Sequence, residues 1–202
     1  MRTPWYTAAQ LKLAYKNNNT AALSRVIDMP SVVSNGYDDV TGDLFTYNKN
    51  IPPSVKQLFE QFYKLIKKPV CDGTLNIIDN YLATGIWSKP SGTSLLKGRD
   101  LGIDYNELLV RSMLRSTTVK KIGSLSGDES GNYILPLTVT DKYTGTDFVL
   151  NLLLQKNTDG VWQITKIVNY HDYLVHVRDL CETDIDSYIK DTKAKNTEYN
   201  NK

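Results

Sequence analysis

The spacing of apolar residues changes once along the chain, from a helical period in the first half to a strand period in the second. Apolar side chains recur every three or four positions in the first half, and they alternate with polar ones after Ser116. This change predicts a helical half, residues 1–115, packed on a curved four-stranded antiparallel meander, residues 116–170. With a closing helix over 171–190, residues 1–190 form a single α+β domain, and 191–202 are expected to be a disordered tail.

The helical half begins with a well-marked helix start. Thr3 is suited to cap a helix, and Pro4 would occupy its first position, where a missing N–H costs nothing. The asparagine run 17–19 ends this helix. A second helix over residues 20–28 cannot pass Pro30, so the two helices are expected to form an αα-hairpin.

Residues 34–53 predict a loop, because glycine, aspartate and asparagine interrupt any helical period there. The length of this loop is unusual for a compact domain and suggests a surface excursion or a flap.

A clear helical pattern then starts at Ser54, with Gln57 three residues later completing a capping box. Pro69 is expected to stop this helix. Two further helices are predicted over residues 74–83 and 105–115.

Four later runs are rich in Val, Ile, Leu and Thr and are separated by glycine-containing joints, as expected for hairpin-linked strands. These strand candidates are residues 117–125, 132–141, 146–155 and 161–169. In the third run Phe148, Leu150, Leu152 and Leu154 share one face, which is expected to be fully buried. Pro136 cannot donate to a ladder, so it is expected at a sheet edge or at a bulge.

Composition and charge restrict the class of protein. The chain has 202 residues, 41% of them apolar, with 24 Lys and Arg against 22 Asp and Glu and a net charge of +2. A chain of this size buries a sizeable core without disulfides. The near-neutral balance argues against a nucleic-acid partner, which would need a basic stripe. No run of even 12 residues lacks polar side chains, so no transmembrane segment is expected.

The sequence contains no recognisable catalytic motif and no metal or cofactor site. His171 and His176 are five residues apart, a spacing that does not match a zinc helix. Asp38, Asp39 and Asp43 fit solvated turn residues better than a calcium loop. Cys71 lacks an activating neighbour beyond nearby lysines, so it is interpreted as a small buried side chain.

Aromatic residues supply the candidate ligand pocket. Three aromatic residues and a histidine on or beside the meander could line a cavity, as an apolar body with a polar tip. These candidate residues are Tyr133, Trp162, Tyr170 and His171. An ordinary core would use the same residues, and that alternative stays open.

The opening of the chain resembles an uncharacterised bacterial family. The resemblance lies in three runs, namely Pro4-Trp5-Tyr6-Thr7, Gln10-Leu11-Lys12 and Ile27-Asp28-Met29-Pro30. It covers about the first 33 residues and, more loosely, the strand 160–167. That family looks like a branch of the nuclear transport factor 2-like superfamily, which implies a cone-shaped sheet around an apolar cavity. The chain departs from the family pattern over 41–104 and from 171 onward.

The resemblance implies an extracytoplasmic protein, since members of the family are usually secreted or membrane-tethered, although these 202 residues contain no targeting segment. In an exported protein Cys71 and Cys181 could form a disulfide. Two unpaired buried thiols are the alternative, and the sequence does not decide between them.

A noncatalytic module that binds an apolar small molecule or a protein is the function we expect from the sequence. One alternative is a small-molecule enzyme that uses His171, beside Tyr170 and Asp172, as an acid or base. The other is an immunity-type or structural interaction domain that works through residues 38–50 or the C-terminal helix. The oligomeric state stays open, with a dimer among the options.

Overall fold

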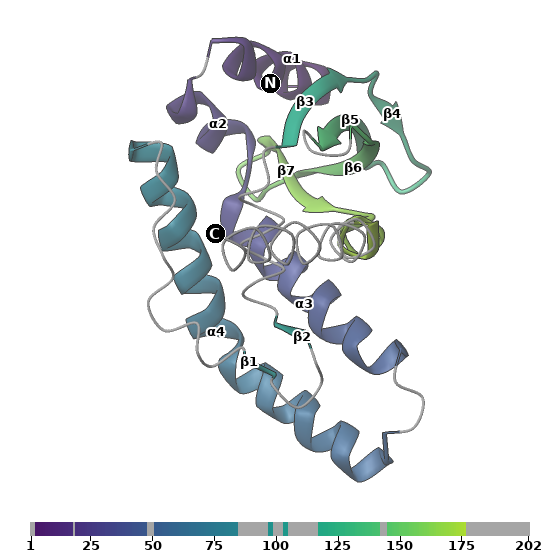
Figure 1. The fold of residues 1–202 in the computed structure, drawn as a ribbon. Coiled ribbons are helices and arrows are strands. Elements are labelled where there is room, and N and C mark those ends of the chain that lie inside the picture. Colours follow the sequence, from purple (N-terminus) through teal and green to yellow (C-terminus); the bar gives the residue numbers. More distant parts are fainter. Residues whose placement is uncertain are drawn as a thin grey trace, which may run out of the picture.

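The computed structural model describes residues 3–17, 19–47, 51–84, 97–98, 103–104, 117–141 and 145–176. For residues 43–47, 97–98 and 103–104 it describes the backbone alone. The chain is an α+β protein (Figure 1). N-terminal helices precede an antiparallel sheet, and a helix over residues 170–176 follows it. This confirms the predicted fold class. The predicted helix 105–115, the rest of the closing helix and the tail lie outside the described residues.

The first two helices confirm the predicted αα-hairpin. Helix α1 spans Pro4–Lys16, and its N-cap Thr3 accepts a hydrogen bond from the Tyr6 backbone N–H at 3.2 Å. Helix α2 spans Thr20–Val26, two residues shorter than predicted, and Asn19 caps it. Both helices therefore begin where a side-chain oxygen satisfies a free backbone N–H.

The loop predicted over residues 34–53 is wrong, because helix α3 spans Met29–Tyr47. Asp28 caps it, with a carboxylate oxygen 3.2 Å from the Ser31 backbone nitrogen. Pro30 thus lies in the first turn of α3, where a proline costs no hydrogen bond. Gly36 and Asp39, two of the residues that interrupt the helical pattern in the sequence, lie against elements outside α3. A Cβ on Gly36 would lie 3.3 Å from the Tyr170 ring, and Asp39 pairs with a lysine of the sheet.

The predicted stop at Pro69 is also wrong, since helix α4 runs through it from Pro53 to Thr84. Proline inside a helix costs about 3 kcal/mol, because one backbone hydrogen bond is lost and the ring crowds the preceding turn. Pro69 is exposed, while Ile66 and Cys71 on either side of it are buried. Packing of α4 on α3 therefore outweighs the local preference to stop.

The sheet has the predicted meander order. Its strands are β3 (Thr117–Ile122), β5 (Tyr133–Asp141), β6 (Asp147–Lys156) and β7 (Trp162–Ile167), and each pairs antiparallel with the next. The two-residue strand β4 (Ser126–Gly127) also pairs with β5. Separately, β1 (Lys97–Gly98) and β2 (Ile103–Asp104) form a short antiparallel pair.

The buried face of the sheet is the one that the sequence predicts. Leu150, Leu152 and Leu154 on β6 are buried, and Phe148 packs against the same cluster. Helices α1, α2 and α3 contact β7, and α3 also packs against α4 (Figure 1). Helix α3 therefore joins the sheet to the long outer helix.

Pro136 is not at a sheet edge, because β5 lies between β3 and β6. The neighbouring strand is interrupted beside it, where β3 ends at Ile122 and β4 begins at Ser126. In this gap the Gly123 backbone N–H donates to the Pro136 carbonyl at 2.8 Å. Since no ladder bond is required from the proline nitrogen there, the residue is tolerated inside the sheet.

Candidate functional site

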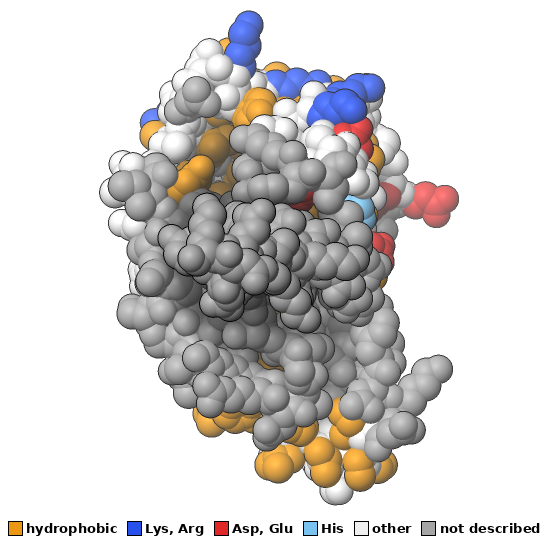
Figure 2. Space-filling view, viewed as in Figure 1, with side chains coloured by type: hydrophobic (Ala, Val, Ile, Leu, Met, Phe, Trp, Pro, Cys, Tyr) orange, Lys and Arg blue, Asp and Glu red, His pale blue; other side chains and the backbone are white. Residues whose placement is uncertain are grey.

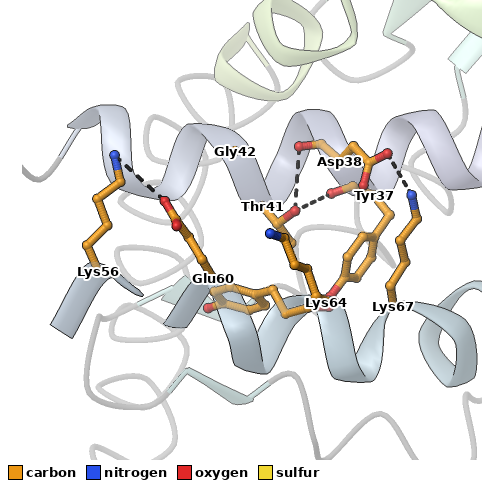
Figure 3. Close-up of a pocket in the computed structure, with 9 residues that line it drawn as sticks. Tyr37, Asp38, Thr41, Gly42, Lys56, Glu60, Lys64 and Lys67 are labelled. Atoms are coloured by element: carbon orange, nitrogen blue, oxygen red, sulfur yellow. Dashed lines mark hydrogen bonds and ion pairs between the residues drawn. The ribbon is translucent and has the colours of Figure 1, made fainter. Parts of the chain in front are cut away.

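A groove between α3 and α4 is the candidate functional site (Figure 3). Its volume is about 200 Å³, which is small compared with typical ligand pockets. Its lining comes from one face of each helix and is rich in lysine and tyrosine. The lining residues are Tyr37, Asp38, Thr41, Gly42, Lys56, Glu60, Tyr63, Lys64 and Lys67.

Among the described residues, two of the three lysines in the groove are paired with acids. The Lys67 ammonium lies 2.6 Å from a carboxylate oxygen of Asp38, and that of Lys56 lies 3.8 Å from Glu60. Lys64 extends from α4 across the groove toward Thr41, and it has no ion-pair or hydrogen-bond partner among the described side chains (Figure 3). Within the part of the chain that the structure describes, the groove therefore presents one uncompensated positive charge, that of Lys64.

Two tyrosines in the lining of the groove, Tyr37 and Tyr63, are half-buried and neutral. The Tyr37 hydroxyl donates to the Tyr63 backbone carbonyl at 2.7 Å, which ties α3 to α4. Burial raises the pKa of Tyr37, and the nearby Cys71, Tyr63 and Asp38 raise it further. Burial also raises the pKa of Tyr63. Both phenols stay protonated at neutral pH and contribute no charge, and the Tyr37 hydroxyl acts as a hydrogen-bond donor.

Among the residues that the structure describes, Cys71 is a buried thiol without a disulfide partner. Burial raises its pKa, although the neighbouring Lys67 opposes the shift. A raised pKa favours the thiol over the nucleophilic thiolate, so this is the environment of a small packed side chain. Cys181 lies outside the described residues, and the disulfide stays a prediction.

Of the predicted pocket residues, Tyr133 and Trp162 lie together. Their ring centroids are 5.2 Å apart in an edge-to-face arrangement, and Trp5 of α1 packs on the other side of Tyr133 at 5.1 Å. The hydroxyl of Thr7 on α1 also donates to the Trp162 carbonyl at 2.9 Å. These contacts make an aromatic cluster between α1 and one end of the sheet.

Tyr170 and His171 lie beyond the opposite end of β7. The six residues of this strand span about 17 Å, so the structure does not bring the two predicted pairs together. Tyr170 packs beside Tyr173, with ring centroids 6.4 Å apart. Burial raises the pKa of Tyr170 to about 12. Ligand binding at either pair stays a prediction.

Two of the three acidic residues considered as calcium ligands have structural partners, and the side chain of the third, Asp43, lies outside the described residues. Asp38 and Asp39 lie on α3 and not in a loop as predicted. Asp38 pairs with Lys67, and Asp39 pairs with Lys166. No group of three potential metal ligands occurs in the described ranges. Among the helices that the structure describes, none is long and apolar enough to cross a membrane.

The sequence reasoning did not identify the groove, because it placed residues 34–53 in a loop. A signal was nevertheless present in α4. Lys56, Glu60 and Lys64 are spaced four residues apart, and Lys67 follows three residues later, so their side chains lie near one face of a helix. Charges on one helix face are usually solvated, and the apposed face of α3 turns them into a groove.

Comparisons of the chain with protein-family models, with curated protein sequences and with solved structures found no match.

Proposed function

We propose that this protein is a noncatalytic binding module that takes a small organic anion in the groove between α3 and α4. The observation that supports this proposal is the uncompensated ammonium of Lys64, which faces Thr41 across an open groove of about 200 Å³. A charge-assisted hydrogen bond from Lys64 would bind a carboxylate or phosphate group. The tyrosines beside it supply apolar surface for the body of the ligand.

Benzoate is a suitable probe, because it combines one carboxylate with an apolar ring of small volume, and inorganic phosphate tests the charge alone. Titration followed by calorimetry or by amide chemical shifts should give saturable binding. Lys64→Gln should weaken it by roughly tenfold or more, since hydrogen bonds to charged groups contribute about 1.5–3 kcal/mol. Lys16→Gln, on the exposed end of α1, is the matched control.

A second variant tests the location independently of charge. A Cβ at Gly42 would meet no atom within 4 Å, so a side chain is accommodated there without a clash. Gly42→Leu should fill the groove and abolish benzoate binding while the thermal midpoint stays equal or rises. Equal benzoate affinity in the wild type, Lys64→Gln and Gly42→Leu would exclude the groove as the site.

We also propose membership of the nuclear transport factor 2-like superfamily and an extracytoplasmic location. The order of helices before an antiparallel meander supports the first proposal, together with the family-like runs at the start of the chain. The second proposal rests on the same resemblance. Fractionation of the cells that make this protein tests the location, and recovery with the cytosolic markers would contradict it.

A further inference from the structure

An exposed apolar row follows the first half of α4. Val55, Leu58, Phe62 and Leu65 are 38%, 66%, 41% and 78% exposed. Their spacing of three, four and three residues is that of the a and d positions of a heptad. Figure 2 shows hydrophobic side chains gathered at the lower end of the molecule, where α4 begins. We call these four residues the α4 seam.

The α4 seam is distinct from the face of α4 that packs in the molecule. Ile66 and Cys71 are buried, and Tyr63 reaches α3 through its carbonyl. Single exposed leucines are ordinary on protein surfaces, but four apolar residues in one row form a continuous patch. Such a patch indicates an interaction surface.

The seam ends abruptly along the same helix. The next positions of the same heptad are Pro69, Asp72, Asn76 and Asp79, and all four are exposed. One face of α4 is therefore apolar before Pro69 and polar or acidic after it. A surface that binds a partner only along residues 55–65 would produce this division.

We propose that the α4 seam packs against the α4 seam of a second copy of this chain, in an antiparallel and two-fold symmetric pair. In antiparallel coiled coils an a residue meets a d residue of the facing helix. Val55 then packs against Leu65 of the second copy, and Leu58 against Phe62. These two pairs and their two symmetry equivalents make four layers, which a two-fold rotation exchanges with one another, as a symmetric dimer interface requires.

The residues beside the seam favour an antiparallel over a parallel orientation of the two helices. The flanking positions on the side away from α3 hold Ser54, Gln61 and Lys68. An antiparallel pair places Gln61 opposite Gln61 and Lys68 opposite Ser54, so no like charges meet. A parallel pair would extend the seam past Pro69 and bring Asp72 of each copy together, which is unfavourable.

A helix is a better occupant than a lipid surface. A row restricted to a and d positions forms a narrow seam, whereas helices that lie in a membrane interface present a broad apolar face. The seam is also short compared with interfaces that bury about 800 Å² per partner, so we expect reversible dimers in the micromolar range.

Sedimentation velocity of the full chain between 1 and 500 µM tests the proposal. The wild type should shift from monomer to dimer as the concentration rises. Leu65→Glu should weaken dimerisation at least tenfold, and because Leu65 is 78% exposed the variant should keep its circular dichroism spectrum and thermal midpoint. Leu13→Glu on α1, where the leucine is 50% exposed, is the matched control and should dimerise like the wild type.

Disulfide trapping tests the orientation. A mixture of the Val55→Cys and Leu65→Cys proteins should give a covalent heterodimer, identified by its mass, with wild type oxidised in parallel as the control. Covalent Leu65→Cys homodimers in its place would show a parallel pair and overturn the arrangement. A protein that stays monomeric at 500 µM overturns the proposal, and so does a monomer that floats with vesicles of 70% phosphatidylcholine and 30% phosphatidylglycerol.

Discussion

The carboxylate of Asp39 on α3 lies 2.8 Å from the ammonium of Lys166 on β7. Both side chains are largely withdrawn from solvent, with exposed fractions of 21% and 30%, and the second carboxylate oxygen of Asp39 is buried without a hydrogen-bond partner. The pair connects the helix that carries the groove to the sheet. Beside it, the Asn35 amide donates to the Thr165 carbonyl at 2.9 Å, so the α3–β7 contact is partly polar.

Removing one member of this pair should destabilise the fold. Lys166→Met leaves the Asp39 carboxylate partly buried and unpaired, which should lower the free energy of unfolding by about 1–3 kcal/mol. The double variant Asp39→Asn with Lys166→Met should recover part of this loss, because no buried charge remains. Urea denaturation of the four proteins of this cycle measures the coupling. Strictly additive effects would show that the contact contributes nothing.

Two glycines in helices should respond in opposite ways to alanine. At Gly73 of α4 a Cβ would meet no atom within 4 Å, so Gly73→Ala should stabilise the protein by about 0.5–1 kcal/mol. At Gly36 of α3 the Cβ would lie 3.3 Å from the Tyr170 ring. Displacing that ring should cost about 1–3 kcal/mol, more than the gain in helix propensity.

Thermal or urea unfolding of the two alanine variants gives the comparison directly. Gly73→Ala should raise the midpoint and Gly36→Ala should lower it. An equal rise in both would mean that Tyr170 moves aside without cost.

The buried hydroxyl of Tyr37 should make the free energy of unfolding depend on pH in the alkaline range. Burial raises the pKa of Tyr37 above its usual value of 10, so the folded state holds the proton more tightly than the unfolded state. The resulting stabilisation is complete below pH 10 and is lost as the pH rises above it. Tyr37→Phe removes the bond to Tyr63 and should cost about 1 kcal/mol at pH 8.

The Tyr37→Phe variant should therefore lose less stability than the wild type between pH 10 and pH 12. Unfolding in urea across this range measures both curves. If the curves stay parallel, Tyr37 ionises equally easily in the folded and unfolded states.

A surface carboxylate should stabilise the protein at neutral pH and lose this effect in acid. Asp147 at the start of β6 pairs with Lys120 of β3 and accepts a hydrogen bond from the Thr140 hydroxyl at 2.5 Å. Lys120 and Thr140 hold the pKa of Asp147 below its usual value of 3.8. The stabilisation is present above that value and is lost as the pH falls through the lower, folded-state pKa. Asp147→Asn should be less stable than the wild type at pH 7.

That difference should disappear on acidification below the folded-state pKa of Asp147. Thermal unfolding at a series of pH values from 7 downward checks this, and Lys120→Met should reproduce the pattern because it removes the largest cause of the shift. A difference that stays constant over the whole acid range would show that the aspartate acts through packing and not through its charge.

The β half of the fold follows closely from the sequence. Alternation places Leu150, Leu152 and Leu154 on one face, and that face is buried. The two hairpin joints that the structure describes in full also lie where expected, and Gly131 and Gly160 there have φ of 79° and 75°, which glycine adopts without strain. These features are local, because the strand period and the turn residues both act over a few positions.

The helical half follows less closely. Gly36, Asp38 and Asp39 read locally as loop residues, yet each of them contacts a distant element, namely Tyr170, Lys67 or Lys166. Pro69 reads as a stop, but α4 continues because its buried face packs on α3. The groove is lined by side chains from both of these helices. A prediction that places residues 34–53 in a loop therefore cannot identify the site.

The sequence by itself therefore determined the fold class, the meander and its buried face, because periodicity and turn chemistry are properties of neighbouring residues. Only the tertiary structure decided that residues 29–47 are helical, that α4 passes Pro69, and that Lys64 faces Thr41 across a groove. These outcomes depend on contacts between residues far apart in the chain, whose packing and pairing energies exceed the local preferences of glycine, aspartate and proline.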